Sequence, residues 1–377
     1  MKRIAIVVSN QHLKPSGGIA TFCKALIDLF RDNDTIVDII ADSNIRGATR
    51  KFVDDMLLPP QINFFYPENA LKYVDNAIEP SQFNKEGVNY QKILNFQNIF
   101  IERSRIVDYD LVIINTQEAM AGIATLQTKC PVFVYTHLYK QIFPDVKITD
   151  NFLPVYHTFY KQFLFCDNIT VATQGERLKE SLLNQGITNC KVLPMPLADK
   201  SLMTKNTQER SGVLFIGTTS IGKRYKEFLK VIEETKLPAK VMTSTASASK
   251  FKKAFDNLGI TDYEIKADII GQEKVDFIKS AKVCFMPSKI ECYSYAFQET
   301  QMHMPVVVLD DQVWTNNFDP KYFIKTNKKE MVQMVQMAYQ INSDSWYEIG
   351  AFEYICDLDA RARAIWVDIL GNLGKNN

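Results

Sequence analysis

Short apolar runs, each followed by a stretch with helical spacing, recur along the chain in two series. They lie at 4–8, 36–41, 111–115, 132–135 and 169–172, and after a break at 213–216, 240–242, 283–286 and 306–309. Alternating strands and helices build parallel sheets, because a parallel strand pair needs a crossover connection. A chain of 377 residues is long enough for two ordinary domains. The pattern therefore predicts an α/β protein with two doubly wound domains.

The polar segment 197–212 separates the two series, because it has no regular spacing of apolar residues. The last part of the chain, 343–373, has helical spacing. We therefore expect one domain over 1–199, a second over 200–354, and a terminal helix over 355–377. Open sheets of this kind bind ligands beyond the carboxyl ends of their strands, so the motifs at those ends are the most informative about function.

Composition limits the classes of partner. The chain has 44 Lys and Arg against 43 Asp and Glu, so any nucleic-acid contact must be local rather than driven by bulk charge. The one visibly basic segment is 201–253, with 11 Lys or Arg and four Asp or Glu. Seven cysteines without C-x-x-C spacing favour a reducing compartment, with neither disulfides nor a zinc site.

No apolar run approaches the roughly 18 residues that a membrane span requires. The N-terminal MKRIAIVVSNQ has a short apolar part and no small-residue cleavage site, so it is predicted to be a strand rather than a signal peptide. We expect a cytoplasmic protein.

The stretch FIGTTSIGKRYK almost matches a phosphate-binding P-loop. Gly217, Gly222 and Lys223 have the G-x-x-x-x-G-K spacing, but Arg224 stands where Ser or Thr would hold a magnesium ion. Lys223 and Arg224, just beyond a strand, are suited to neutralise a diphosphate, and arginine can do so with two hydrogen bonds. A phosphate site of another kind is therefore favoured over an ATP-binding loop, with a solvated basic turn as the alternative.

Two motifs follow strands of the first domain. Gly17 and Gly18 open a helix, where positive φ values and free amides allow a phosphate or a sugar hydroxyl to approach the backbone. A plain strand-to-helix turn is the alternative. His137 follows the strand at 132–135, where a polar side chain can face a cleft. For a lone histidine, a core or surface position is the commoner case.

The segment PSKIECYSYAFQETQ follows the strand at 283–286. Glu291 lies in the loop before a predicted helix, and Glu299, eight residues later, lies on that helix. The amides near Ser294 and Tyr295 fall at the helix N-terminus, which attracts phosphate. Carboxylates on either side of such a phosphate cradle suit the hydroxyl groups of a ribose and of a sugar.

A metal site is not expected. Asp108 and Asp110 have D-x-D spacing but precede a strand, away from the ligand-binding edge, and Asp357 and Asp359 lie in the terminal helix. We expect both pairs on the surface.

Together these motifs resemble the donor site of retaining glycosyltransferases of the GT-B fold. The likeness covers nearly the whole chain. It rests on Glu291-x7-Glu299 after Pro287-Ser288, on Ile269 and Gly271 before them, and on the order of Gly17-Gly18, His137, Gly217 and Lys223. The resemblance implies two Rossmann-like domains facing across a cleft. The acceptor would bind to the first domain, residues 1–199, and the nucleotide sugar to the second, residues 200–354. The helix at 355–377 would cross back to the first domain.

The resemblance also implies roles for single residues. Gly17 and Gly18 would lie against the donor diphosphate or the transferred sugar, and His137 would line the cleft near that sugar. Lys223, beside Gly217, would bind the diphosphate. A UDP-sugar would be the co-substrate, and no cofactor or metal would be required.

In the second half of the motif, Glu291 would hold hydroxyls of the donor sugar and Glu299 would hold the ribose. The amides of Ser294 and Tyr295 would bind phosphate. The catalytic set implied in this way is His137, Lys223 and Glu291.

The chain departs from the family at two places. Thr218 stands where relatives commonly carry arginine after the glycine, and Arg224 is a candidate replacement. The usual E-G-F-G loop is Glu291-Cys292-Tyr293-Ser294 here, which makes it stiffer and leaves the identity of the sugar open.

Among GT-B enzymes, the chain is most similar to the T-even phage transferases that modify 5-hydroxymethylcytosine in DNA. The likeness rests on the short segments GGIATF, IINTQEA, VYTH, GTTSIGK and VMTSTASASKF. It implies a flipped-out base whose hydroxymethyl group attacks the sugar. Local basic groups would contact the DNA backbone, namely Arg46, Arg50, Lys51, Arg103 and Arg105. The alternatives are a bacterial transferase for surface polysaccharide or glycolipid, a non-catalytic nucleotide-sugar binding protein and a P-loop ATPase.

Overall fold

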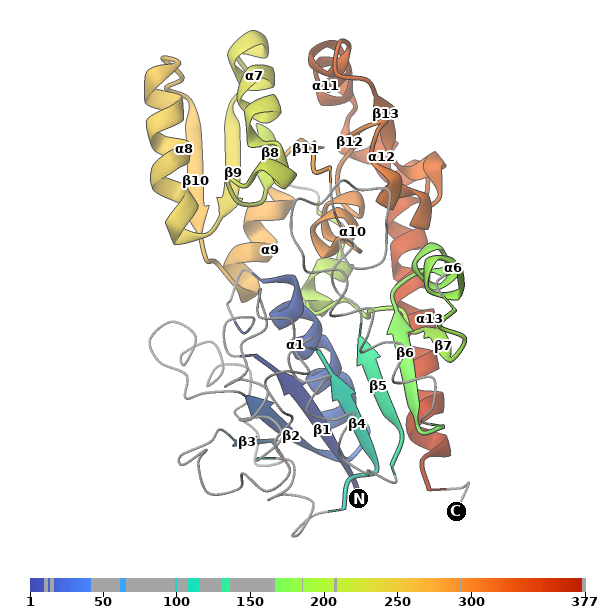
Figure 1. Ribbon diagram of the computed structural model, residues 1–377. Helices are drawn as coiled ribbons and strands as arrows, with labels where there is room; N and C mark the ends of the chain where they lie inside the picture. The colour runs from blue at the N-terminus through green and yellow to red at the C-terminus, as the bar shows by residue number, and fades with distance from the viewer. Residues whose placement is uncertain are drawn as a thin grey trace. The chain divides into compact units, whose positions relative to one another are not determined.

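The computed structural model describes residues 1–9, 13, 17–41, 62–65, 99, 108–115, 130–135, 167–184, 186–206, 209–289, 291 and 293–374. The chain divides into two compact units. The first unit comprises Met1–Pro196 with Ala362–Asn377, and the second comprises Leu197–Arg361. Each unit contains one parallel sheet with helices packed on it (Figure 1).

The sheet of the first unit has the strand order β3-β2-β1-β4-β5-β6-β7. Its strands are β1 (Lys2–Val8), β2 (Thr35–Ala41), β3 (Ile62–Phe65), β4 (Leu111–Ile114), β5 (Val132–Tyr135), β6 (Ile169–Thr173) and β7 (Cys190–Val192), with helices α1 (Gly18–Arg31) and α6 (Glu176–Asn184). Every side chain of β4 and β5 is buried. Strands covered on both faces need such continuous apolar runs, which explains why the sequence pattern locates them.

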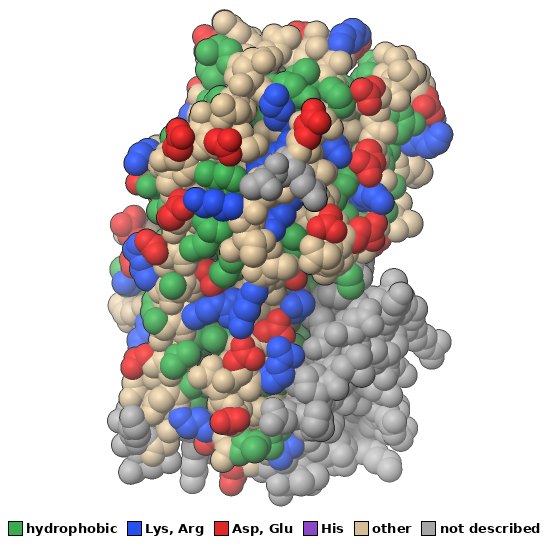
Figure 2. Space-filling view, turned by 180° about the vertical axis from the view of Figure 1, so that it is seen from behind, with side chains coloured by type: hydrophobic (Ala, Val, Ile, Leu, Met, Phe, Trp, Pro, Cys, Tyr) green, Lys and Arg blue, Asp and Glu red, His purple; other side chains and the backbone are tan. Residues whose placement is uncertain are grey.

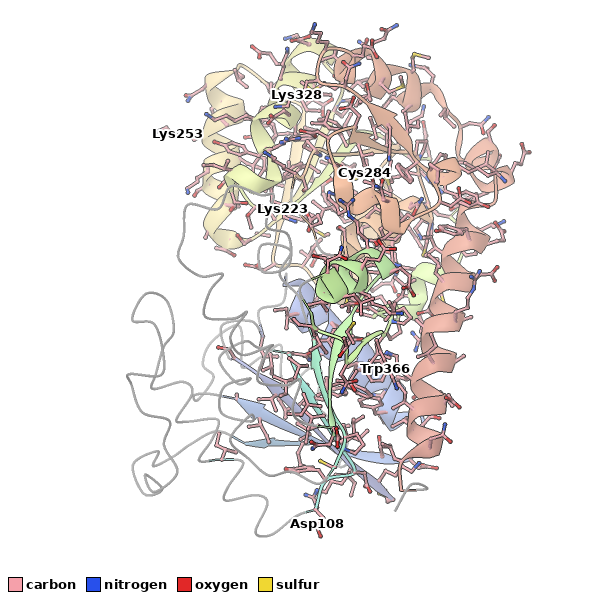
Figure 3. The ribbon with its side chains drawn as sticks, turned by 45° about the vertical axis from the view of Figure 1, so that its right-hand side comes forward. Asp108, Lys223, Lys253, Cys284, Lys328 and Trp366 are labelled. Atoms are coloured by element: carbon pink, nitrogen blue, oxygen red, sulfur yellow. The ribbon has the colours of Figure 1, made fainter. Side chains whose placement is uncertain are left out.

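Part of the last helix, α13 (Ala351–Asn372), packs in the first unit. Trp366, labelled in Figure 3, is fully buried. Its ring stacks on that of Tyr135, with ring centroids 6.1 Å apart. Its indole nitrogen donates to the carbonyl of Pro194 at 3.1 Å. Because indole combines a large apolar surface with one donor, this contact both fills the core and satisfies a backbone carbonyl.

The sheet of the second unit has the order β10-β9-β8-β11-β12-β13. Its strands are β8 (Val213–Ile216), β9 (Ala239–Thr243), β10 (Tyr263–Ala267), β11 (Val283–Met286), β12 (Val306–Leu309) and β13 (Ile324–Thr326). Its helices are α7 (Tyr225–Thr235), α8 (Thr245–Asn257), α9 (Gly271–Lys279), α10 (Tyr295–Gln301), α11 (Met331–Gln340), α12 (Ser343–Glu348) and the first half of α13. The core below α7 and α8 is aromatic: Phe215 lies 5.1 Å from Phe228 and 5.4 Å from Phe251, centroid to centroid.

Two details differ from the sequence-based expectations. The pattern missed β3, β7, β10 and β13, and these four are the edge strands of the two sheets. Edge strands are covered less, and β10 has no fully buried residue, so it needs no apolar run. The expectation that both D-x-D pairs lie on the surface is wrong for Asp359. Its side chain is buried and accepts a hydrogen bond from the amide of Leu197 at 2.6 Å.

Candidate functional site

The strand order of the second unit reverses at β8, which lies between β9 and β11. Open sheets bind ligands in the crevice beyond the carboxyl ends of the strands at this reversal. The turn after β8 and the loop after β11 meet there, because the amide of Lys289 donates to the carbonyl of Gly222 at 2.8 Å. Residues from both segments therefore share one edge of the sheet.

Lys223 and Glu291, both predicted as site residues, are brought together at this edge. The ammonium group of Lys223 donates to Oε1 of Glu291. Lys223 ends a single turn of 3-10 helix, Ile221–Lys223, that follows β8, and Glu291 lies in the loop that follows β11. Their side chains are 29% and 15% exposed. Water therefore reaches the pair, and a ligand anion can compete with the carboxylate for the lysine.

Gly217, another predicted site residue, supports the position of Lys223. It directly follows β8, with φ at 157°. A Cβ added at Gly217 would lie 3.3 Å from Cδ of Lys223 and 3.3 Å from Cζ of Phe215. The methylene chain of the lysine thus packs on the bare backbone of the glycine, and a side chain there would displace it.

Arg224 is fixed by a residue that the sequence did not single out. Its guanidinium makes two hydrogen bonds to the carboxylate of Asp311, at 2.7 and 2.5 Å, while its backbone has φ at 50°. These hydrogen bonds hold the pKa of Asp311 below its ordinary value. The one signal for Asp311 was its place just after β12, at the same edge of the sheet. Much of the charge that Arg224 would offer a diphosphate is already balanced by this carboxylate.

Glu299 lies on α10 and its side chain is only 2% exposed. Oε1 of Glu299 is 2.5 Å from the ammonium of Lys274, on α9, and that ammonium is also 3.6 Å from Asp199. Sequence reasoning found Glu299 but missed both partners. Lys274 follows Gly271 of the recognised motif by three residues, so its spacing was visible, but its contact with α10 depends on tertiary packing.

Ser294 and Tyr295 begin α10, as the sequence predicts. Ser294 is the N-cap, and its hydroxyl accepts a hydrogen bond from the amide of Phe297 at 3.3 Å. This cap explains why the helix starts here, after a loop that carries Glu291. The role of the two residues in binding phosphate stays a prediction.

The predicted residues of the first unit are described only in part. Gly17 is the N-cap of α1 with φ at −88°, so it does not adopt the positive φ that the glycine pair suggested. A Cβ added at Gly18 would meet no described atom within 4 Å, which leaves room beside its backbone. His137, Arg46, Arg50, Lys51, Arg103 and Arg105 lie outside the described residues.

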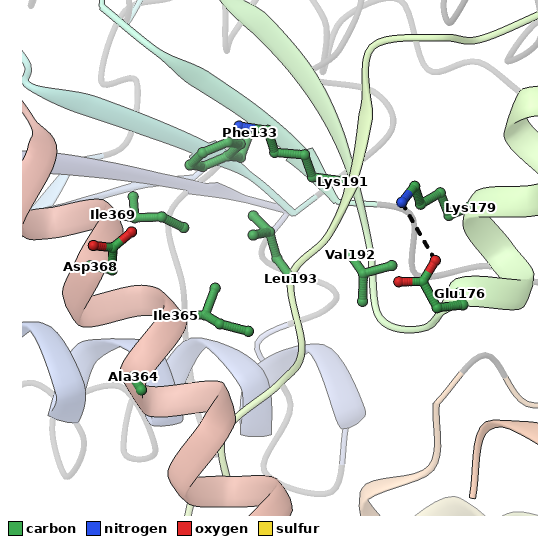
Figure 4. Close-up of a pocket in the computed structure, with 10 residues that line it drawn as sticks. All are labelled: Phe133, Glu176, Lys179, Lys191, Val192, Leu193, Ala364, Ile365, Asp368 and Ile369. Carbon is green, nitrogen blue, oxygen red and sulfur yellow. Dashed lines mark ion pairs between the residues drawn. The ribbon is translucent and has the colours of Figure 1, made fainter. Parts of the chain in front are cut away.

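A separate hollow of about 650 Å³ lies on the first unit, between α6, β7 and α13. Apolar residues such as Val192 and Ile365 line it, with the ion pair of Lys179 and Glu176 at its side (Figure 4). None of the predicted site residues that the structure describes lines this hollow. It therefore does not belong to the site at β8 and β11.

In the described part of the chain, no three His, Cys, Asp or Glu side chains gather as metal ligands. No described helix combines the length and the apolar character that crossing a membrane demands. On the face in Figure 2, Lys and Arg are interspersed with Asp and Glu over the described surface, in keeping with the balanced net charge.

No protein-family model and no curated protein sequence matches the chain. Solved structures do. Sucrose-phosphate synthase from Thermosynechococcus elongatus is similar over 100% of both chains, with a TM-score of 0.76 and 11% identity. TarM is similar over 99% of this chain and 98% of its own, with a TM-score of 0.71 and 12% identity. HepE from Anabaena, solved with UDP and glucose, covers 98% and 100%, with a TM-score of 0.65 and 12% identity. These full-length matches confirm the prediction of a GT-B fold built from two doubly wound, Rossmann-like units.

Proposed function

We propose that the protein is a retaining glycosyltransferase that takes its sugar from a UDP-sugar donor. One observation carries the proposal: Lys223 and Glu291, chosen from the sequence as diphosphate and sugar ligands, form an ion pair at the strand reversal of a GT-B fold. Similar structures were solved with UDP, among them HepE with UDP and glucose. Their likeness to this chain supports a donor of the same class.

In the proposed reaction, the bond between the anomeric carbon and the diphosphate oxygen breaks through an oxocarbenium-like state. The acceptor hydroxyl oxygen bonds to that carbon on the same face, and its proton passes to the leaving phosphate. Negative charge grows on the diphosphate as it departs, and Lys223 stabilises it. Such stabilisation of developing charge is usually the largest catalytic term. Glu291, released by Lys223, would accept hydroxyls of the sugar.

The proposed reaction draws its positive charge from side chains rather than from a metal ion or a cofactor. Lys223 is the central cation, and Arg224 is a second one that Asp311 holds in place. Gly17 and Gly18, His137, and the amides of Ser294 and Tyr295 keep the roles that the family resemblance implies. In this proposal the second unit supplies most of the nucleotide-sugar site, Gly17 and Gly18 reach the donor from the first unit, and the acceptor binds to the first unit.

For the acceptor, we propose 5-hydroxymethylcytosine in phage DNA, which would place the enzyme in the host cytoplasm. The support is the resemblance of short segments such as GGIATF and VYTH to the T-even phage transferases. Because the net charge is near zero, local basic groups would have to make the contacts with the DNA. A bacterial surface polysaccharide or glycolipid is the second candidate. It is favoured by the likeness to TarM, of which an S. aureus variant was solved with fondaparinux, alpha-GlcNAc-glycerol and UDP at a TM-score of 0.72.

The test is a panel of donors and acceptors. The full-length protein is incubated with labelled UDP-sugars and, separately, with hydroxymethylated DNA, unmodified DNA and simple glycans, and label on each acceptor is counted. Transfer to hydroxymethylated DNA alone supports the first acceptor, and glycan products alone support the second. UDP-sugar binding without any transfer would leave only a binding protein. ATP binding without UDP-sugar binding would overturn the donor assignment altogether.

A further inference from the structure

Three charged side chains, Asp199, Lys274 and Glu299, form a cluster inside the second unit. The ammonium of Lys274 lies 2.5 Å from Glu299 and 3.6 Å from Asp199. The side chains of Asp199 and Lys274 are each 12% exposed, and that of Glu299 is 2% exposed. One cation therefore serves two carboxylates where water hardly reaches.

Lys274 occupies a position that its own helix disfavours. It is the fourth residue of α9, in the first turn, where the helix dipole repels a cation. Removing an ammonium group from water adds a further penalty. Burial lowers the pKa of Lys274, but the attraction of Glu299 and Asp199 outweighs it and holds the pKa above its ordinary value. The contact with the carboxylates thus accounts for a lysine at this place.

Glu299 depends on that contact for its charge. Burial raises the pKa of its carboxyl above its ordinary value, Lys274 offsets part of this rise, and Asp199 adds to it. These two residues are the charged groups that face Glu299 in the described part of the chain. An ionised carboxylate accepts hydrogen bonds on both oxygens, whereas a protonated carboxyl uses one oxygen as a donor. The partner of Glu299 therefore decides how well it can accept the hydroxyls of a ligand.

We propose that Lys274 is a positioning residue of the nucleotide site, which holds Oε1 of Glu299 so that Oε2 accepts a hydroxyl of the nucleotide ribose. The inference rests on the proposed function, which assigns the ribose to Glu299. Asp199 competes for the same ammonium group and so tunes the contact. Lys274 itself does not touch the ligand.

The experiment measures the Kd of UDP-glucose against pH by calorimetry. This probe has no terminal phosphate monoester, so its own charge does not change near neutral pH. The full-length wild type is compared with Lys274→Met, Lys274→Arg, Asp199→Asn and Glu299→Gln. Lys252→Met, which removes a lysine that is 65% exposed on α8, is the matched control.

In the wild type, affinity falls as the pH drops through the pKa of Glu299. Lys274→Met moves this inflection to higher pH and weakens binding by about tenfold for each pH unit below it, because only ionised Glu299 binds the ribose. Asp199→Asn moves the inflection to lower pH, since it removes a repelling charge. Lys274→Arg restores the wild-type profile, Lys252→Met leaves it unchanged, and Glu299→Gln binds weakly without this inflection.

A second probe separates positioning from general damage. With the 2′,3′-dideoxyuridine analogue of UDP-glucose, which lacks both ribose hydroxyls and also has no terminal phosphate, Lys274→Met and the wild type should bind alike. A loss of UDP-glucose affinity that is the same at every pH, or an Asp199→Asn profile that does not shift, overturns the role of Lys274. The pH profile of Asp199→Asn tests the role of Lys274 even if Lys274→Met fails to fold. A wild type that binds no uridine nucleotide overturns the proposed function, and this inference with it.

Discussion

The pairs Lys223–Glu291 and Lys274–Glu299 are built from the same residue types, but water reaches them differently. The side chains of the first pair are 29% and 15% exposed, and those of the second are 12% and 2% exposed. The first pair joins two loops at the strand reversal, whereas the second joins helices α9 and α10. One motif of two glutamates thus yields one pair that water reaches and one that it hardly reaches.

The difference has an energetic consequence. An ion pair that water can reach contributes about 0–1 kcal/mol, so a ligand can replace one partner at little expense. An enclosed pair is different, because removing one partner leaves the other charge buried and uncompensated. We therefore expect changes at Lys223 to affect turnover and changes at Lys274 to affect stability as well as binding.

The largest expected effect is on stability, at Lys274. Lys274→Met should lower the free energy of unfolding by about 3–5 kcal/mol, because Glu299 and Asp199 lose their shared cation. Urea unfolding of the full-length protein measures this change. Lys252→Met, on the surface of α8, should stay within about 0.5 kcal/mol of the wild type. A loss below about 1 kcal/mol for Lys274→Met would show that the enclosed pair behaves like a surface pair.

Next comes the effect of Lys223→Ala on turnover. We expect a decrease of about 10²–10³-fold in kcat, as for other groups that stabilise charge in a transition state, with stability changed by about 1 kcal/mol or less. Initial rates of UDP-sugar turnover and urea unfolding provide the two numbers. Glu291→Gln sharpens the result. It should bind UDP at least as tightly as the wild type, since it frees Lys223 from a competing carboxylate, while its turnover falls. Unchanged turnover in Lys223→Ala would remove this lysine from the reaction.

A smaller effect is expected where Lys223 packs on Gly217. Gly217→Ala places a Cβ 3.3 Å from the lysine chain, on a backbone with φ at 157° that side chains rarely adopt. It should reduce kcat by about tenfold, because the strained turn and the added Cβ both misplace the ammonium group. Gly222→Ala is the matched control, because a Cβ there meets no described atom within 4 Å. Equal rates for the two variants would mean that the glycine does not determine where Lys223 lies.

The interior strands, and both residues of the Lys223–Glu291 pair, are predictable from the sequence for related reasons. Interior strands such as β11 and β12 are buried along their whole length, so their apolar runs are visible in the sequence. The edge strands β10 and β13 are half-exposed and leave no such run. Lys223 and Glu291 were identifiable because each follows an interior strand, and the two meet where those strands end.

The contact between Lys274 and Glu299 could not be predicted from strand ends. Glu299 came from its spacing to Glu291, but nothing in the sequence says which of the many lysines meets it. Lys274 and Asp199 are 25 and 100 residues away, and they reach one carboxylate only because α9 packs both on α10 and on the 3-10 helix that follows Asp199. Asp311 was predictable only in part. Its position after β12 is readable, but its partner Arg224 depends on a backbone turn with φ at 50°.

The smallest expected effect concerns Arg224 and Asp311, because the Asp311 side chain is 45% exposed. Hydrogen bonds from Arg224 hold the pKa of Asp311 below its ordinary value, so the ionised carboxylate stabilises the folded protein. This contribution is present above the pKa of the unfolded chain and is lost as the pH falls through the lower folded-state pKa. Asp311→Asn should therefore reduce the unfolding free energy by about 0.5 kcal/mol near neutral pH, and by nothing once the carboxylate is protonated. Urea unfolding at both pH values tests this. A loss of unfolding free energy as large as that of Lys274→Met would show that the Arg224–Asp311 pair behaves like an enclosed pair. A loss that persists in acid would show that the contact does not depend on the charge of Asp311.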